Sequence, residues 1–447
     1  MKLGISVLIL AATPIWAQAP LTLADAVRMA LDKHPSIEAS AARSKAAETR
    51  IEQARGNYLP KVNYSEMFAR SDNPVFVFSS LLTQHQFSEK NFAIGPLNRP
   101  DFMNNFQSVV SVDQVVYDAG QIRNGVRSAE LGRKIAGEDE RLTRSGVIAN
   151  VLRAYFGAVL AQEGLNVANE AVKSAEADSK RAGTVRAAGM ATDADVLSIR
   201  VHVSAMKEQQ IRRTYDLSVA RAALNEALGL PLDTEHSLTT PLAAVALDVP
   251  GLDKYEKTAV AERAEAQQVG LATKLAETQA QAARSALLPQ VGVRAVFEAD
   301  RQRFINRGGA NWLLAASLKW NVFNGFSDRA RINEAAESLR GAKAVERQTA
   351  SGIRLQVRKA HADLRAAEER IEVATAAVAM AEESLRIIKN RYEAGLATVT
   401  DLLRNETMLH ETRTRRLAAV YDQRVAATML ELAAGTLAPD SESVRNR

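Results

Sequence analysis

The sequence predicts a mainly α-helical protein with a small β part, assembled from two copies of one structural unit. Landmarks recur at a constant spacing: Gly395 follows Gly189 by 206 positions (395 − 189), and Asp401 follows Asp195 by the same distance. Long stretches without proline carry a helical pattern, and two pairs of short segments alternate apolar and polar residues as strands do. A constant offset over a long stretch indicates an internal duplication, so one unit explains both halves.

The first residues have the features of an export signal. Lys2 precedes an apolar run from Leu3 to Ala12, and small residues lead to a cleavage position after Ala17. This order is typical of a secretory signal peptide, so we expect residues 1–17 to be removed. No later stretch reaches the roughly 18 apolar residues that a membrane-spanning helix needs. The mature chain is therefore expected to be exported without a transmembrane helix.

The composition argues against most enzyme and nucleic-acid-binding classes. The chain has no cysteine, which excludes disulfides, thiol catalysis and cysteine metal sites. Its 57 basic and 52 acidic residues nearly cancel and are interspersed, unlike the clustered basic patch of a nucleic-acid-binding protein. The six histidines are scattered without the spacing of metal ligands. We therefore predict no enzymatic activity, no cofactor, no metal site and no nucleic-acid partner.

The first repeat is predicted to cover residues 18–230. Its helical stretches, the first of which has a break at His34-Pro35, are separated by two segments with strand periodicity, and a glycine-containing turn reverses the last helix. The predicted elements are a helix over 22–57, strands at about 61–70 and 108–117, and a coiled-coil hairpin with its tip at 186–195.

The second repeat is predicted to cover residues 254–435, after a proline-containing linker over 231–253. Pro289 follows Pro60 by 229 positions, so the first strand pair carries a loop about 23 residues longer than the second (229 − 206). An insertion at a loop tip is well tolerated. The remaining predicted elements are strands at about 290–298 and 312–323, a hairpin tip at 391–401, and a C-terminal tail over 436–447.

Each predicted tip has the residues of a tight helix-turn-helix connection. Gly189 and Gly395 can supply the left-handed backbone that ends a helix. A threonine then precedes an aspartate by three residues, which is the spacing of an N-terminal capping box. The simplest interpretation of Asp195 and Asp401 is therefore helix capping, and this does not exclude a second role.

The last predicted strand has an apolar face with a tryptophan at each end, Trp312 and Trp320. Its expected length is close to the height of the apolar band of an outer-membrane barrel, at about 3.3 Å per residue. A strand buried in the core of a water-soluble protein is the alternative. A membrane sheet must close on itself, and four strands cannot. Two copies would give eight strands with a filled interior, and three would give twelve with room for a channel.

The helices of the second repeat carry a heptad pattern. Ile371, Val378, Leu385 and Tyr392 are seven residues apart, with small residues between them, as in a closely packed coiled coil. In the first repeat the same seam is predicted to turn polar at Ser179. We expect these helices to provide length and rigidity.

Taken together, these features resemble the TolC family of outer-membrane efflux proteins. The shared features are the signal peptide, the duplicated helix–strand–loop–strand–helix halves, Leu-Pro before each first strand, Tyr-Asp-Ala-Gly and Phe-Asn-Gly-Phe after each second strand, and the Gly…Asp tips. The resemblance implies a homotrimer in which a shared 12-stranded transmembrane β-barrel continues into a trimeric periplasmic α-barrel of duplicated coiled coils. The partners it implies are a periplasmic adaptor (membrane fusion) protein, an inner-membrane pump of the RND, ABC or MFS type, and outer-membrane lipid.

The resemblance also assigns gate residues at the tips. Tyr392 matches the family's gate tyrosine, and Asp195 matches the acid that its hydroxyl binds on a neighbouring coil. Asp401 matches the outer of two acids around the narrowest aperture, but the second position is Arg404 here, and the family's gate arginine is replaced by Ala397. A Tyr392–Asp195 latch remains expected without its charged partner. Alternatively, Tyr392 is simply the last core position of its heptad.

The resemblance places two further sets of residues. The tips are expected to dock the adaptor through Gly189, Thr192, Gly395 and Thr398, and Trp312 and Trp320 are expected to lie at the membrane interfaces.

The predicted function is the outer-membrane exit duct of a tripartite efflux or type I secretion system, extending into the periplasm. Conduction would be passive, with energy supplied by the pump, and the cargo could be a drug, a metal, a metabolite or a protein. The alternative is a soluble periplasmic coiled-coil adaptor or scaffold, which would explain the helices but not the strands. A periplasmic hydrolase would need a convergent polar pocket that the sequence does not offer.

Overall fold

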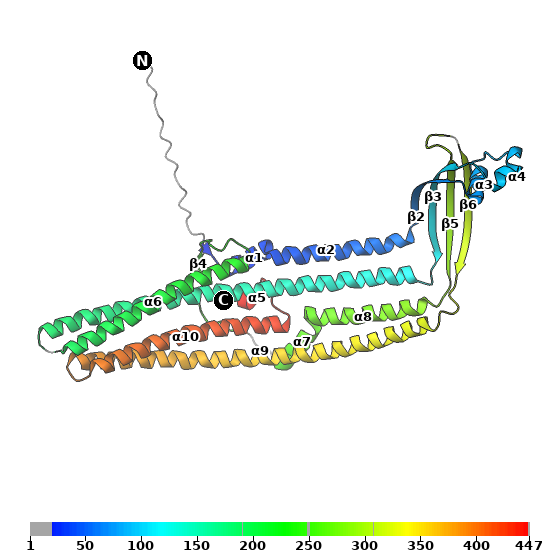
Figure 1. Cartoon of the computed structure of the whole chain (residues 1–447). Coiled ribbons are helices and arrows are strands. Elements are labelled where there is room, and N and C mark those ends of the chain that lie inside the picture. The colour runs from blue at the N-terminus through cyan, green and yellow to red at the C-terminus, as the bar shows by residue number, and fades with distance from the viewer. Residues whose placement is uncertain (1–19, 190, 248–250, 307, 446–447) are drawn as a thin grey trace, which may run out of the picture. The chain divides into compact units, whose positions relative to one another are not determined.

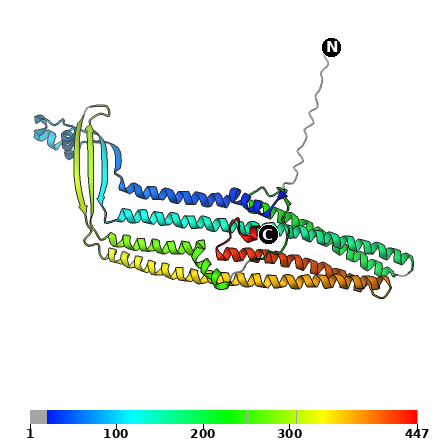
Figure 2. The ribbon, with the colours of Figure 1, turned by 180° about the vertical axis from the view of Figure 1, so that it is seen from behind.

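The computed structural model describes residues 20–189, 191–247, 251–306 and 308–445, so the predicted signal peptide, residues 1–17, lies outside it. The chain forms two units, which appear in Figure 1 and, from behind, in Figure 2. We name them the sheet unit and the hairpin unit. The sheet unit comprises residues 42–137 and 268–347, and the hairpin unit comprises residues 1–41, 138–267 and 348–447.

The sheet unit contains four antiparallel strands in the order β2-β3-β5-β6, labelled in Figure 1. Their bounds are Lys61–Ser71 for β2, Met103–Tyr117 for β3, Gln290–Arg301 for β5 and Gly309–Lys319 for β6.

All four strands differ from the prediction at one end or both. Strand β2 ends at Ser71 rather than 70, β5 ends at Arg301 rather than 298, and β6 begins at Gly309 rather than 312. Strand β3 begins at Met103 rather than 108, because the polar Asn104, Asn105 and Gln107 interrupt the apolar alternation there. Strand β6 ends at Lys319 rather than 323, because Lys319 pairs with the first residue of β5, Gln290. Trp320 therefore lies beyond the strand, where its indole N–H donates a hydrogen bond to the Leu287 carbonyl oxygen at 3.0 Å.

One face of this sheet is apolar and exposed. The pairing aligns Tyr64 with Val110, Val110 with Phe297, and Phe297 with Trp312, so one row of apolar side chains crosses all four strands. All four are exposed, and Trp312 is 79% exposed. Because successive strand residues point to opposite faces, the other face carries polar residues from the same strands.

The long loop between β2 and β3 was predicted without helices, and the structure shows short ones in it. They are α3 (Pro74–Thr83), the 3₁₀ helix η2 (Glu89–Phe92) and α4 (Ile94–Asn98). The Gln84 side-chain amide donates to the Asn105 side chain at 2.9 Å, and Asn105 donates to Asp300 at 2.6 Å. Asn105 and Asp300 lie on the polar face, so these hydrogen bonds hold the loop against that face.

Helices account for most of the chain. The longest are α5 (Gln121–Ala187) and α9 (Ser327–Glu393), with 67 residues each, and both contribute residues to the two units. None of the helices in the described residues is both long and apolar enough to cross a membrane. The remaining helices are α1 (Leu23–Lys33), α2 (Pro35–Arg55), η1 (Gly56–Tyr58), α6 (Asp193–Leu228), α7 (Leu252–Glu262), α8 (Ala264–Ser285), α10 (Val399–Ala434) and α11 (Glu442–Arg445).

Two helical hairpins, α5 with α6 and α9 with α10, organise the hairpin unit. The core of the first surrounds α1 and includes Leu23, Leu152 and Phe156, while that of the second includes Leu364 and Leu430. Two residues that follow α10, Leu437 and Val444, pack into the first core.

A buried tyrosine ties the predicted linker to this core. Strand β1 (Pro20–Leu21) pairs in parallel with β4 (Ser237–Leu238), which lies within the linker. The fully buried Tyr155 hydroxyl donates to the Leu21 carbonyl oxygen at 2.8 Å and accepts from the Thr240 N–H at 3.0 Å. The linker segment that follows β4 is therefore part of the folded unit.

We expect Tyr155→Phe to destabilise the protein by about 1–3 kcal/mol, because the Thr240 N–H loses its partner in a buried position. Thermal unfolding of the purified protein measures this change. Tyr421→Phe is the control, since no hydrogen bond of the Tyr421 hydroxyl occurs among the described residues, and it should shift the midpoint much less. Equal shifts for the two variants would contradict the hydrogen-bonding role of Tyr155.

Candidate functional site

The two hairpin tips have the same backbone construction. Gly189 and Gly395 adopt left-handed φ values of +77° and +73° and end α5 and α9. Thr192 and Thr398 then cap α6 and α10, each accepting a hydrogen bond from the backbone N–H three residues later. The capping prediction from the sequence is confirmed for both tips.

The tip aspartates complete these caps. The Asp195 carboxylate accepts hydrogen bonds from the Thr192 N–H and hydroxyl at 3.0 and 2.7 Å. Asp401 accepts from the Thr398 N–H and hydroxyl at 3.1 and 2.7 Å. These hydrogen bonds hold the pKa of both carboxyls, the half-buried Asp195 and the exposed Asp401, below the usual range. Both aspartates therefore remain charged at neutral pH and are free to face solvent or a partner.

Tyr392 connects the second hairpin to the first. Its half-buried ring packs against a small apolar cluster made by Ala182 of α5, Val196 and Ile199 of α6, and Val399 of α10. Burial, and then the nearby Asp195 charge, raise the pKa of its hydroxyl. The structure thus brings Tyr392 and Asp195 near each other, but no hydrogen bond between them occurs in the described chain.

The charged residues around the tips include two that the sequence analysis did not single out. Arg181 of α5 forms an ion pair with Glu393 of α9, so a charged contact joins the hairpins although the family's gate arginine is absent. Arg404 is exposed, and its charge contributes to the lowered pKa of Asp401.

A buried polar cluster lies further from the tips and receives one residue from each of the four hairpin helices. Lys389 Nζ of α9 lies 3.2 Å from Asp178 Oδ1 of α5. His202 Nε2 of α6 lies 3.3 Å from Glu406 Oε2 of α10. The Ser174 hydroxyl donates to Glu406 Oε1 at 3.3 Å. We name Asp178, His202, Lys389 and Glu406 the interhairpin cluster.

A strict heptad pattern does not predict the interhairpin cluster. The first-repeat seam passes through Ala175 and then through the buried Asp178 and Ala182, rather than through Ser179 as predicted. The buried position is thus residue 178 instead of residue 179, so an acid occupies a core position. The three- and four-residue spacing from Ala175 to Asp178 to Ala182 was the available signal.

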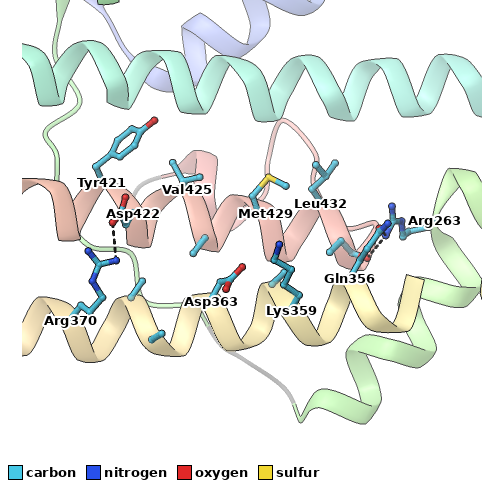
Figure 3. Close-up of a pocket in the computed structure, with 15 residues that line it drawn as sticks. Arg263, Gln356, Lys359, Asp363, Arg370, Tyr421, Asp422, Val425, Met429 and Leu432 are labelled. Atoms are coloured by element: carbon cyan, nitrogen blue, oxygen red, sulfur yellow. Dashed lines mark hydrogen bonds and ion pairs between the residues drawn. The ribbon is translucent and has the colours of Figure 1, made fainter. Parts of the chain in front are cut away.

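A cavity of about 590 Å³ lies between α9 and α10 and contains none of the predicted gate residues (Figure 3). The Arg370–Asp422 ion pair, 3.0 Å long, bounds one end, and a hydrogen bond from Arg263 to Gln356 at 2.7 Å bounds the other. A second cavity of about 570 Å³ shares Ala366 and Arg370 with the first, so the groove continues along the two helices.

The outer helices of the two hairpins also carry exposed apolar stripes. Exposed apolar side chains recur on one face of α6 and of α9, opposite the buried face of each helix. An exposed helix face is normally polar, so an apolar one needs a covering partner. The α6 stripe comprises Leu197, Val201, Ile211, Tyr215 and Val219, and the α9 stripe comprises Leu355, Val373, Met380 and Ile387.

No group of three or more histidine, aspartate or glutamate residues with the geometry of a metal site occurs in the described parts of the chain. The site thus consists of capped tips, a half-buried tyrosine and a buried ionic cluster. These features suit mechanical contact between the helical hairpins.

Comparison with known proteins identifies the family. Residues 26–230 and 257–436 match the family model described as outer membrane efflux protein. The first matched range lies in the first repeat, and the second lies mostly in the second repeat.

Two curated relatives match along most of the chain. Protein CyaE of Bordetella pertussis is 25% identical over 423 residues, covering 93% of this chain and 84% of the relative. The alkaline protease secretion protein AprF of Pseudomonas aeruginosa is 22% identical, covering 93% and 85%. The crystal structure of the Campylobacter jejuni CmeC outer membrane channel has the same fold, with a TM-score of 0.79, 17% identity and coverage of 95% and 88%.

Proposed function

The chain belongs to the outer membrane efflux protein family, and we propose that it works as a homotrimeric exit duct that opens at its hairpin tips. It is an outer-membrane protein with a periplasmic extension, and it provides the exit of an efflux or type I secretion system. In the proposal, a periplasmic adaptor and an inner-membrane pump deliver the cargo and supply the energy. The duct itself conducts passively, without catalysis.

The proposal of a trimer rests on the two exposed apolar stripes. One lies on α6 of the first repeat and the other on α9 of the second, so the two differ and complement each other in a head-to-tail contact. A head-to-tail contact generates a ring when its rotation closes. The sheet supports the same arrangement, because β2 and β6 leave both of its edges open. Three copies would supply twelve strands.

The apolar face of the sheet is proposed to contact lipid. Its row of exposed side chains, Tyr64, Val110, Phe297 and Trp312, would be costly in water on a protein without a membrane partner. Trp312 and Trp320 would lie at the two membrane interfaces, where amphipathic rings are favoured. A soluble periplasmic adaptor, the alternative from the sequence, leaves this face without a purpose.

The tips are proposed to form the gate and the adaptor-docking surface. Gly189, Thr192, Gly395 and Thr398 shape the two turns. Asp195, Asp401 and Arg404 would face the aperture or the adaptor. Tyr392 holds the second hairpin against the first, and a Tyr392–Asp195 hydrogen bond would add a latch in the assembled channel. Opening would separate the coils by untwisting.

The cargo is proposed to be an exported protein. This rests on AprF, whose name assigns it to secretion of an alkaline protease and which matches 93% of this chain. A duct for small molecules is the other outcome. In a strain lacking the gene, loss of one or more secreted proteins from the medium supports protein cargo. Unchanged secretion with increased sensitivity to small toxic compounds supports the other.

Membrane fractionation with an unheated denaturing gel tests the assembly. We expect the protein in the outer-membrane fraction, as a band at roughly three times the monomer mass that collapses on boiling. Purified protein should also form channels in planar lipid bilayers. A soluble periplasmic monomer or dimer that forms no channel would overturn the proposed function.

A further inference from the structure

The interhairpin cluster joins the two hairpins where the channel must open. Its two ion pairs, Asp178–Lys389 and His202–Glu406, each connect one helix of the first hairpin with one helix of the second. Separating the hairpins therefore breaks both pairs together. The Lys207–Glu176 ion pair nearby joins α5 to α6 within one hairpin and would survive the same movement.

The cluster is buried and incompletely paired. The side chains of Asp178 and Glu406 are only 4% and 8% exposed. Asp178 Oδ2 makes no hydrogen bond, and Glu406 Oε2 lies within ion-pair distance of His202 without hydrogen-bond alignment. A buried carboxylate oxygen without a donor is costly. The Asp178 and Glu406 carboxyl groups lie within hydrogen-bonding reach of each other, so one shared proton would satisfy both oxygens.

The charged groups around the cluster do not supply hydrogen bonds to Asp178 Oδ2 and Glu406 Oε2. Arg413 of α10 is engaged with Glu170 of α5 at 3.1 Å and with Glu382 of α9 at 2.7 Å. Arg181 of α5 is engaged with Glu393 of α9. The other charged or titratable groups around the cluster are His410 and Glu411 of α10, Arg213 of α6 and Tyr392 of α9.

Within the cluster, Lys389 supplies one positive charge. His202 supplies a second only when it is protonated. His410 is half-buried near His202 and Arg213, and its pKa is lowered by burial and then by the Arg213 charge. Within the cluster, two ionised carboxylates would therefore face the single permanent positive charge of Lys389.

We propose that Asp178, Lys389, Glu406 and His202 form a proton-binding lock that holds the hairpins together in the closed channel. The inference rests on the proposed function, because it assumes that the hairpins separate when the duct opens. The proton is shared by the Asp178 and Glu406 carboxyl groups and resides mainly on Asp178. Loss of the proton leaves two buried like charges and weakens the closed state.

The direction of the pH dependence follows from the Asp178 carboxyl. Burial, and next the neighbouring Glu406, raise its pKa from 3.8 to about 6. Separated hairpins expose it to water, where the ordinary value returns. The closed state thus binds the proton more tightly, so closure is favoured below pH 6 and weakens as the pH rises through about 6. A single site with these two values changes the ratio of open to closed channels roughly tenfold between pH 5 and 7.5.

Single-channel recording in planar bilayers at pH 5 and 7.5 tests the lock. We expect wild-type openings to become roughly tenfold more frequent at the higher pH. Asp178→Asn keeps a neutral side chain at both pH values and should reduce the change to less than about twofold. Glu406→Gln removes the second carboxylate and should flatten the response as well. Glu176→Gln, which removes an exposed acid two residues from Asp178, is the matched control and should keep the wild-type response.

The outcomes separate the lock from the function on which it rests. A wild-type channel with no pH response, or an Asp178→Asn channel that keeps the full response, would overturn the lock while leaving the duct intact. Absence of any wild-type channel would overturn the duct and the lock together. The unheated gel shows whether each variant still assembles, and Glu406→Gln decides the question if Asp178→Asn does not.

Discussion

Two aspartates on the α6 stripe, Tyr215→Asp with Val219→Asp, are expected to abolish the trimer and its channel activity. Both side chains are about 70% exposed in the single chain, so the substitutions cost little there. In the proposed ring they would be covered by α9 and α10 of the next copy. Burying an unpaired carboxylate costs several kcal/mol, which exceeds what the remaining stripe contacts offset.

The internal duplication predicts where Tyr215 binds. Within one chain, the Tyr421 hydroxyl of α10 lies 4.0 Å from the position of a Cβ at Gly157 of α5. The offset of 206 residues converts Tyr421 into Tyr215 and Gly157 into Asp363. A second copy's Tyr215 should therefore meet Asp363, which lines the groove between α9 and α10 (Figure 3). Where repeat 1 has a glycine, repeat 2 has a carboxylate that can accept a hydrogen bond from the tyrosine hydroxyl.

The unheated gel and bilayer recording measure this prediction. Ser198→Asp and Ala205→Asp are the matched control, because both residues are exposed on α6 but lie away from the stripe. The control should keep the trimer band and the channel. Trimers that persist in the Tyr215→Asp, Val219→Asp variant would show that α6 is not the contact. Asp363→Ala should weaken the trimer without abolishing it.

Much of the fold could be predicted because it is encoded by repetition. The tips depend on local chemistry: a glycine for the left-handed turn, then a threonine and an aspartate at capping distance, as at Thr192 and Asp195. The strands depend on alternation, which is visible wherever one face is apolar, as around Trp312. Such signals lie within a few residues of each other and need no knowledge of the rest of the chain.

The parts that could not be predicted depend on contacts between distant segments. Near the start of β3, the polar residue Asn105 forms hydrogen bonds with Gln84 and Asp300. These partners lie far from Asn105 in the sequence, so no local pattern predicts the hydrogen bonds. Asp178 and Lys389 are 211 residues apart (389 − 178), and only the folded arrangement of α5 and α9 brings their side chains within 3.2 Å of each other. In sequence each of them is an ordinary charge on a long helix. Where the buried positions depart from a strict heptad by one residue, the heptad pattern therefore does not predict which polar residues are buried.

Gly189 precedes α6 and Gly229 follows it, and both have a left-handed backbone. Replacing each by alanine is expected to lower the stability of the protein by very different amounts. Gly189→Ala should destabilise the protein by about 1–2 kcal/mol, the cost of a left-handed backbone for a residue with a Cβ. Nothing lies within 4 Å of the new atom. Gly229 has nearly the same φ, +71°, but its Cβ would lie 2.9 Å from His34 Cα and 3.0 Å from the Lys33 carbonyl oxygen. Gly229→Ala should therefore cost about 3–4 kcal/mol, because overpacking is added to the backbone cost.

The duplication supplies an internal replicate of this experiment. Gly395 is the counterpart of Gly189 and has open space around it, whereas a Cβ at Gly435, the counterpart of Gly229, would lie 2.9 Å from Arg263 Cγ. Thermal unfolding of the four alanine variants should thus group them by surroundings rather than by repeat. The collision at Gly435 involves a side chain that is buried and hydrogen-bonded to Gln356, so Arg263 cannot move away freely. If all four variants lose the same stability, the backbone conformation alone decides the need for glycine, and the close approach of α1 to the end of α6 contributes nothing.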